Sequence, residues 1–394
     1  MRNFMRKSIS TSLMILMISG VLTGCFPDGK KTLSEDAFTN DLTAIPEELQ
    51  ETLAENLIID ADIVVPEKFP AKTYQATLKE GDKENIEQVF LSNKEVTNVE
   101  EIPNDFDRTK TNYLYSTADE ASLFIEDGNI LFNEKKAIDC QYTRYVKGHS
   151  FFMDYNLKKT FPKETLNNVD REASVQYFKD ICDELGVEIS GEPEVYALDV
   201  ENLDRITDYS EEQPNREPIE KWTEEDQVYF INAHVLYDAF PMTQFGYITK
   251  SGYGEGTRLS VFFGVNGLIE FSLNHFYEIM DNGKDISEIC SLDVANNAIK
   301  EKYKNTILSN PITVSEIRLE YVPVQKDVEK QIYELTPMWV YTASQDSQIT
   351  KGQQATEDNQ MTKEEAEKVI ETTNIFQIYV DALTGAEFDI GGTL

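Results

Sequence analysis

Two stretches of the chain place a tight turn between apolar runs, and this arrangement limits the sheets that the chain can form. Residues 120–135 read EASLFIEDGNILFNEK, with Asp127-Gly128 in the middle. Residues 257–273 read TRLSVFFGVNGLIEFSL, with Asn266-Gly267 near the middle. Asp-Gly and Asn-Gly adopt the positive φ angles that two-residue hairpin turns require. Strands joined in this way run antiparallel, so the sequence predicts antiparallel sheets.

Two amphipathic helices are expected to precede sets of such strands. Residues 170–187 (DREASVQYFKDICDELGV) and 291–305 (SLDVANNAIKEKYKN) carry apolar residues at helical spacing. The strands after each helix end in a similar hairpin, VFFGVNGLIEF in the first set and IYVDALTGAEF in the second. An amphipathic helix can cover one apolar face of a short antiparallel sheet. We therefore predict an α+β fold with antiparallel sheets, each covered by a helix, in tandem repeats.

This interpretation divides the chain into five parts. Residues 1–24 are expected to form a signal peptide, 25–45 a polar tether, and 46–165 a small α+β N-terminal domain. That domain is predicted to begin with a short helix from Pro46 to Leu57. Residues 166–285 form the first helix-plus-sheet repeat and 286–394 the second.

The N-terminus resembles that of a bacterial lipoprotein. Basic residues precede a mostly apolar run from Leu13 to Leu22, which is about half the roughly 20 residues of a membrane-spanning helix. The run ends in Leu22-Thr23-Gly24-Cys25, which matches the lipobox at every position. The resemblance implies cleavage before Cys25 and a diacylglycerol on its thiol, giving two acyl chains and stable attachment to the membrane. The alternative is an ordinary secretory signal with a chance cysteine.

The charge of the chain excludes one class of partner. It carries 71 Asp and Glu against 36 Lys and Arg, a formal net charge of −35. Nucleic-acid binders need a basic surface, so no nucleic-acid partner is expected. Anionic lipid would also repel this surface, which leaves the acyl chains on Cys25 to hold the protein at the membrane. A solvated acidic surface is favoured over a cation-binding one.

Three cysteines follow Cys25, and their number and spacing fit no zinc motif. They are Cys140, Cys182 and Cys290. A disulfide between Cys182 and Cys290 is one possibility, and buried free thiols are the other and favoured one.

The C-terminal strands resemble a known kind of envelope module. The stretches IRLEYVPV (317–324), LTPMWVY (335–341) and IYVDALTGAEFD (378–389) are similar to PepSY-like modules and to the YycI-type envelope proteins of Gram-positive bacteria. The matching residues are Pro337, Trp339, Asp381, Ala382, Thr384 and Gly385. The whole chain also resembles uncharacterised lipoproteins of Firmicutes. The resemblance implies regulators that act by binding, and it carries over no catalytic residues.

No catalytic or metal-binding motif stands out among the polar residues. His149, His234 and His275 lack paired ligand spacing, so structural or surface roles are favoured. The three glycines in KSGYGEGTR (250–258) precede a strand and not a helix, which favours a hairpin loop over a phosphate cradle. The acidic stretch DNGKDISE (281–288) lacks the EF-hand order of ligands, so a solvated loop is favoured over calcium binding.

Trp222 and Trp339 could each form a platform for a ligand, and the other interpretation of Trp339 is a place in the core. Trp339 alternates with its neighbours in a predicted strand, which favours the core. No metal or other cofactor is expected.

Taken together, these features predict a lipid-anchored protein on the extracytoplasmic face of the cell membrane. It would bind or regulate an envelope protein through an exposed sheet face or edge, without catalysis. One alternative is a solute-binding lipoprotein, which would need two α/β lobes with parallel sheets; the hairpin turns argue for antiparallel sheets, and a ligand pocket between domains would revive this alternative. Another is an envelope hydrolase, which would need a polar cluster assembled from distant residues.

Overall fold

The computed structural model describes most of the chain from residue 37 onwards. The described ranges are 37–70, 72–104, 107–140, 161–208, 222–249, 252–304, 310–350, 369–388 and 392–393, with residues 142, 143, 146, 157 and 306. Residues 36–394 form one compact unit. The predicted signal peptide and the lipobox residues Leu22, Thr23, Gly24 and Cys25 lie outside the described residues, as does His149.

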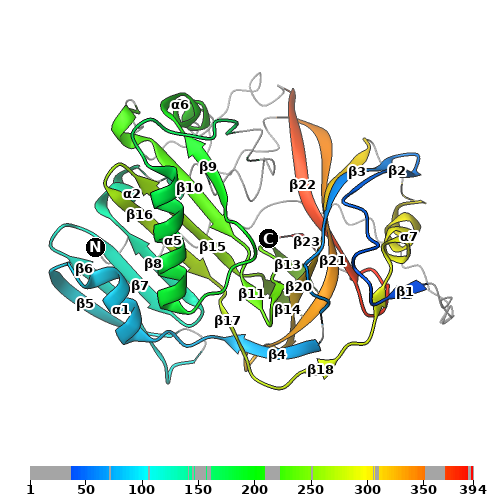
Figure 1. Cartoon of the computed structure of the whole chain (residues 1–394), viewed down its shortest axis with the longest axis horizontal. Helices are drawn as coiled ribbons and strands as arrows, with labels where there is room; N and C mark the ends of the chain where they lie inside the picture. The colour runs from blue at the N-terminus through cyan, green and yellow to red at the C-terminus, as the bar shows by residue number, and fades with distance from the viewer. Residues whose placement is uncertain are drawn as a thin grey trace. The chain divides into compact units, whose positions relative to one another are not determined.

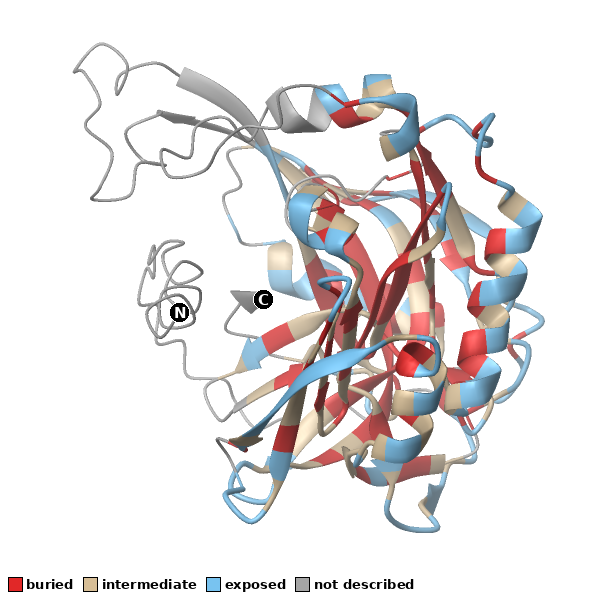
Figure 2. Ribbon diagram, turned by 90° about the vertical axis from the view of Figure 1, so that its left-hand side faces the viewer, coloured by how far each residue is buried: buried red, intermediate tan, exposed pale blue. Residues whose placement is uncertain are grey.

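Two large sheets organise the described part of the chain (Figure 1). The strand order of the first sheet is β5 (Val96–Pro103), β6 (Thr111–Thr117), β7 (Ser122–Glu126), β8 (Asn129–Asn133), β16 (Gly267–Asn274), β15 (Arg258–Gly264), β10 (Val228–Ala233) and β9 (Glu194–Leu198). Every neighbouring pair in it is antiparallel. β5 forms one edge of this sheet and is exposed along nearly all of its length (Figure 2).

The second sheet gathers strands from both ends of the chain. Its order is β17 (Tyr277–Ile279), β4 (Lys72–Leu78), β21 (Ile332–Thr350), β20 (Ile312–Asp327), β3 (Leu57–Val64) and β2 (Glu48–Ala54), with β22 (Val369–Asp381) beside β21 and β18 (Lys284–Asp285) beside β4. β3 and β20 run parallel, and the other pairs are antiparallel.

The remaining described strands form smaller sheets of two or three strands. They are β1 (Phe38–Thr39) with β19 (Ile289–Cys290), β11 (Leu236–Tyr237) with β12 (Phe240–Pro241), and β13 (Gly246–Thr249) with both β14 (Gly252–Glu255) and β23 (Gly392–Thr393).

The helices cover the sheets. α1 (Lys83–Leu91) and α5 (Arg171–Leu185) contact each other and cover one face of the first sheet, while α7 (Leu292–Tyr303) packs on β2 and β22 (Figure 1). The other helices among the described residues are α2 (Lys135–Cys140), α6 (Val200–Asp208) and the short 3₁₀ helix η3 (Glu224–Asp226). Side-chain caps fix where the long helices begin: Asp82, Asp170 and Ser291 accept hydrogen bonds from first-turn amides of α1, α5 and α7.

The predicted fold class is confirmed: the fold is α+β with mostly antiparallel sheets. Both turns that suggested it are also present. Glu126 pairs with Asn129 across the turn that contains Gly128, whose φ is 70°. Gly264 pairs with Gly267 across the second turn, and Gly267 has a φ of 104°.

The expected N-terminal domain (46–165) does not form a separate unit, because its strands are divided between the two sheets. β2, β3 and β4 join the C-terminal strands β20 and β21. β5 to β8 continue into the strands of the expected first repeat through the β8–β16 pair, where Phe132 lies opposite Phe271. Within the first sheet, a helix followed by four sheet strands occurs twice, as α1 with β5–β8 and as α5 with β9, β10, β15 and β16. The tandem likeness between 166–285 and 286–394 stays a prediction.

Two local predictions near the N-terminus are also corrected. The expected helix from Pro46 to Leu57 is strand β2, because residues 48–54 pair with β3 at the edge of the second sheet. The expected tether at 25–45 includes residues that belong to the folded body. Ala37 and Leu42 are buried, and Phe38 pairs with Cys290. Because Ala37 and Leu42 pack against the rest of the unit, residues 37–45 are part of the folded body and not of the expected tether.

Candidate functional site

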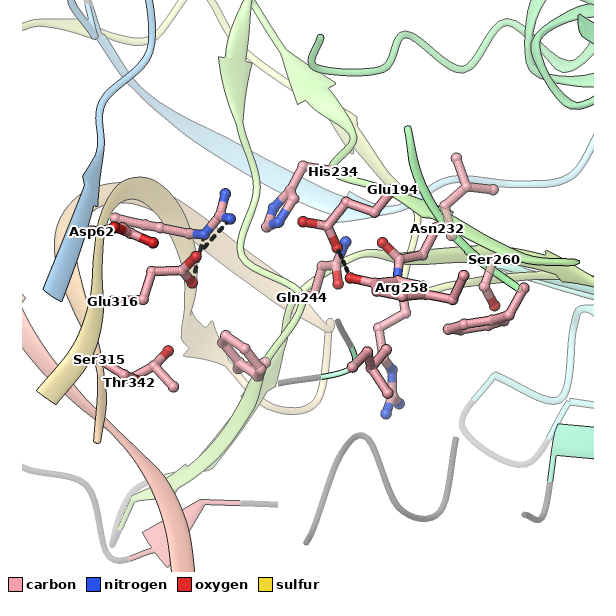
Figure 3. Close-up of a pocket in the computed structure, with 16 residues that line it drawn as sticks. Asp62, Glu194, Asn232, His234, Gln244, Arg258, Ser260, Ser315, Glu316 and Thr342 are labelled. Atoms are coloured by element: carbon pink, nitrogen blue, oxygen red, sulfur yellow. Dashed lines mark hydrogen bonds and ion pairs between the residues drawn. The ribbon is translucent and has the colours of Figure 1, made fainter. Parts of the chain in front are cut away.

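A polar cavity of about 220 Å³ lies between the two sheets, and we call it the intersheet cavity (Figure 3). Strands β9, β10 and β15 of the first sheet contribute Glu194, Tyr196, Phe230, Asn232, Arg258 and Ser260. Strands β3, β20 and β21 of the second sheet contribute Asp62, Ser315, Glu316, Arg318 and Thr342. His234, Gln244 and Phe245 come from the segments that connect β10 to β13.

Strand alternation explains why these side chains meet. Along β10, Tyr229 and Ile231 face the core under α5, while Phe230 and Asn232 face the opposite side. On that side Phe230 belongs to a buried aromatic cluster, and the polar Asn232 follows it two residues later. The same face of the sheet thus changes from apolar to polar along the strand. The polar end opens into the intersheet cavity.

Arg318 is held in the cavity by its neighbour on β20. Its Nε lies 2.8 Å from Oε1 of Glu316, and its Nη2 donates a 2.8 Å hydrogen bond to Oε2 of the same carboxylate. This geometry is bidentate and occupies the fork of the guanidinium. Burial disfavours the charge on Arg318, but the Glu316 hydrogen bonds outweigh burial and hold the pKa of the guanidinium above its ordinary value.

Glu320 follows two residues later on the same face of β20 and is only 1% exposed. Its Oε1 lies 3.1 Å from Nδ1 of His234, and the same nitrogen lies 3.2 Å from the carbonyl oxygen of Met242. Because a carbonyl oxygen can only accept, Nδ1 carries the hydrogen and donates it to Met242. Burial alone would raise the pKa of Glu320, but His234 and then Arg318 outweigh it and hold the pKa below its ordinary value.

Several buried polar atoms around the cavity lack hydrogen bonds from the described residues. Asn232 Oδ1 and Gln244 Nε2 belong to residues that line it. Neither carboxylate oxygen of Glu320 accepts a well-formed hydrogen bond, and the groups that offset the burial of its charge are His234, Arg318 and the side chain of Thr243. The hydroxyl of Tyr379, which interacts with Glu320, is fully buried and also unsatisfied. Each such group costs about 1–3 kcal/mol unless water or a ligand satisfies it.

A larger groove of about 650 Å³ lies elsewhere, between α1, α5 and the β15–β16 turn. None of the buried polar atoms left unsatisfied by described residues belongs to its lining. The intersheet cavity is therefore the stronger candidate site, because its walls present hydrogen-bonding capacity that the described protein groups do not use.

The two described histidines lie in different parts of the structure. His234 lines the intersheet cavity, whereas His275 lies at the β16–β17 junction with a positive φ of 54°. Its Nδ1 is 3.2 Å from Oε2 of Glu255, and burial lowers the pKa of the imidazole. The structure thus brings one of the two described histidines to the candidate site.

The glycine-rich stretch 250–258 forms part of a hairpin. Gly252–Glu255 is strand β14, which pairs with β13. Gly254 and Gly256 allow close backbone approach: a Cβ on Gly256 would lie 1.8 Å from the carbonyl oxygen of Thr243. The glycines therefore serve packing here, as the hairpin interpretation requires.

The acidic stretch 281–288 shows a local turn. Oδ1 of Asp281 accepts hydrogen bonds from the amides of Gln75 and Gly283. Among the described residues, no group of three or more His, Cys, Asp or Glu side chains is placed to hold a metal ion.

Trp339 belongs to the core. It is fully buried in β21, and its Nε1 donates a 3.1 Å hydrogen bond to the carbonyl oxygen of Cys290.

Cys140, Cys182 and Cys290 are free thiols, so the possible Cys182–Cys290 disulfide is not formed. Within the described ranges, no helix has the length and apolar character needed to cross a membrane.

The cavity residues other than His234 escaped sequence analysis, although one readable pattern was present. The alternating positions 316, 318 and 320 of a long buried strand are Glu, Arg and Glu, where apolar residues are the rule. Charged side chains on a strand face that points inward must pair with other protein groups or belong to a binding site, because burying an unpaired charge is costly. The partner sheet that completes the cavity could not be identified from this pattern.

Comparison with known proteins supports the fold and names no function. No family model matches the chain, and no curated protein matches it. Among solved structures, the chain is similar to the crystal structure of an uncharacterized protein from Eubacterium rectale, with a TM-score of 0.64 and 16% sequence identity. The match covers 89% of this chain and 96% of that one. At this level of identity, the likeness shows that the two chains share a fold.

Proposed function

We propose that this chain is a non-catalytic recognition protein. It binds an envelope protein by accepting one of the partner's side chains in the intersheet cavity. The observation that carries the proposal is the set of buried polar atoms around the cavity that the described residues leave unsatisfied. A partner group that supplies the missing hydrogen bonds would recover the cost of burying them.

The size of the cavity favours a single side chain over a whole cofactor. Pockets for drug-sized ligands run from roughly 300 to 1,000 Å³, and this cavity has about 220 Å³. A small polar solute would fit the same volume, so a solute-binding lipoprotein is the second candidate, favoured by the position of the cavity between the two sheets.

The geometry of His234 favours binding over nucleophilic catalysis. Its Nδ1 faces Glu320 and Met242, which resembles the way a base is oriented in a catalytic triad. A triad would also need a nucleophile in contact with the imidazole. No described hydroxyl or thiol forms a hydrogen bond with His234.

The exposed edge strand β5 is a separate feature, and the proposed partner contact does not include it. Val96 and Val99 are 40% and 46% exposed, and β5 pairs on one side with β6. An exposed edge can accept an extended segment as a further strand. Glu100 and Glu101 beside these residues oppose pairing with a second copy of this acidic chain.

Photo-crosslinking in the membrane tests the proposal. A photoreactive phenylalanine analogue replaces Ser315, an exposed residue at the cavity, in the full-length chain. The matched control places it at Thr111, an exposed strand residue on β6 of the other sheet. We expect a discrete protein adduct from position 315 whose crosslinked peptide is the same in every preparation, and no such adduct from position 111. An adduct of small-molecule mass would favour the solute-binding candidate, and equal patterns from both positions would contradict both candidates.

We also propose that a lipid on Cys25 holds the protein at the extracytoplasmic membrane face. Mass spectrometry of the membrane-purified chain should find Cys25 as the first residue, carrying a diacylglycerol. In Cys25→Ser, the peptidase site lacks its acylated cysteine, so residues 1–24 should remain attached. Recovery of an intact, unacylated wild-type chain from the cytosol would refute the anchor.

A further inference from the structure

We infer that the group the intersheet cavity takes is the cationic end of a Lys or Arg side chain. This inference rests on the proposed function and deepens it by naming the chemistry of the recognised group.

The charge of the cavity wall favours a cation. Its acidic side chains are Asp62, Glu194 and Glu316, with Glu320 behind His234, and its basic side chains are Arg258 and Arg318. Both arginines already have carboxylate partners, since Arg318 pairs with Glu316, and Nη2 of Arg258 lies 2.7 Å from Glu255. No described Lys or Arg forms an ion pair with Asp62 or Glu194, although Arg318 also interacts electrostatically with Glu194 and Glu320.

The hydrogen-bonding capacity of the wall, and of Glu320 behind His234, points the same way. The buried Oδ1 of Asn232 accepts no hydrogen bond from described residues, and neither does either oxygen of Glu320 in good geometry. Glu194 accepts a 2.8 Å hydrogen bond from the hydroxyl of Tyr196 and has further acceptor sites. The unused buried acceptors, three oxygens of Asn232 and Glu320, thus outnumber the unused buried donors, which are Nε2 of Gln244 and the hydroxyl of Tyr379. A group rich in N–H donors satisfies such a wall.

The two sheets place their acidic groups on opposite sides of the cavity. Glu194 comes from β9 in the first sheet, and Asp62 comes from β3 in the second (Figure 3). The charges of Glu194 and Arg318 are close enough to interact. An ammonium or guanidinium group between the sheets would face carboxylates from both. An anionic group would instead have to displace Glu316 from the occupied fork of Arg318.

Ligand-observed NMR titration of the full-length protein in detergent tests this inference. The probes are N-acetyl-lysine amide and N-acetyl-arginine amide, and their neutral counterparts are the norleucine and citrulline amides. The acidic probe is N-acetyl-glutamate amide. We expect the cationic probes to bind at least about tenfold more tightly than their neutral counterparts, since charge-assisted hydrogen bonds are roughly twice as strong as neutral ones. Binding should weaken as salt is raised.

Variants locate the interaction. Glu194→Gln and Asp62→Asn should each weaken cation binding several-fold, whereas Glu101→Gln on the exposed edge strand β5 should leave it unchanged. Ser315→Trp, at the cavity wall, should abolish binding. Thr111→Trp is its matched control, and thermal melting curves establish that each variant is folded.

The outcomes separate this inference from the proposed function. If neutral probes bind as tightly as cationic ones and Ser315→Trp removes both, the cavity recognises side chains but the cationic preference is wrong. The cationic preference is also wrong if the glutamate probe binds best. If no probe binds, the inference is overturned, and crosslinking from position 315 then decides the proposed function separately.

Discussion

Nδ1 of His234 and Oε1 of Glu320 lie 3.1 Å apart and join the two sheets at the base of the intersheet cavity. His234 follows β10 of the first sheet, and Glu320 lies in β20 of the second. A carboxylate this deeply buried is costly unless it is paired. The contact therefore links the stability of the sheet packing to the charge of one glutamate.

Glu320 should make the stability of the protein fall in acid. Its pKa in the folded state lies below the ordinary value of 4.5, so its charge contributes stability that is fully present above about pH 4.5. That contribution is lost as the pH falls through the lower, folded-state pKa. Glu320→Gln should lower the free energy of unfolding at pH 7 by about 1–3 kcal/mol and should flatten its decline in acid.

Urea unfolding of the wild type and Glu320→Gln between pH 7 and pH 3 measures this effect. Glu101→Gln removes the same charge from the exposed strand β5 and should follow the wild-type curve. A Glu320→Gln variant that declines as steeply as the wild type would show that another group causes the loss.

The sequence predicts local structure well because its determinants are local. Asp127-Gly128 forces a turn wherever the neighbouring strands go, and Asp170 caps α5 through an amide three residues away. Leu292, Ala295 and Ile299 lie on one face of α7 and are buried as their helical spacing indicates. Each of these features is decided within a few residues, so none depends on a distant partner.

The pairing of strands that lie far apart in the sequence could not be predicted in the same way. β3 pairs with β20, more than 200 residues later, and Phe132 of β8 meets Phe271 of β16. Residues 48–54 have a helix-compatible composition but form a strand because β3 offers them an edge. The candidate site depends on this pairing, since Asp62 and Glu194 meet only when both sheets are assembled.

Trp339 should affect stability and leave recognition intact. Trp339→Phe removes the Nε1 hydrogen bond, leaves the carbonyl of Cys290 without this donor, and opens a small cavity beside it. We expect a loss of about 2–4 kcal/mol in the free energy of unfolding, with lysine-probe binding unchanged at a temperature where the variant is folded. A variant of wild-type stability that no longer binds the probe would return Trp339 to a recognition role.

The two buried thiols should be inert in the native protein. Burial raises the pKa of both Cys182 and Cys290 to about 12, so almost no reactive thiolate is present at neutral pH. Cys140 is partly exposed and should react first, although burial also raises its pKa. Non-reducing peptide mapping after alkylation should find three free thiols in urea and label mainly on Cys140 in buffer. A mapped peptide that joins Cys182 to Cys290 would contradict this assignment.

The last prediction concerns why the stretch 250–258 contains glycine. A Cβ at Gly256 would overlap the backbone of Thr243, at 1.8 Å from its carbonyl oxygen, whereas a Cβ at Gly191 would meet no atom within 4 Å. Gly191 has a positive φ of 65°, so Gly191→Ala should cost about 1 kcal/mol from backbone strain. Gly256→Ala must also displace the segment that carries Gln244 and Phe245 in the cavity wall, and we expect it to cost several times more. Urea unfolding compares the two variants directly. Equal losses would mean that close packing is not the reason for glycine at 256, and the phosphate-cradle alternative would then merit a direct binding test with inorganic phosphate.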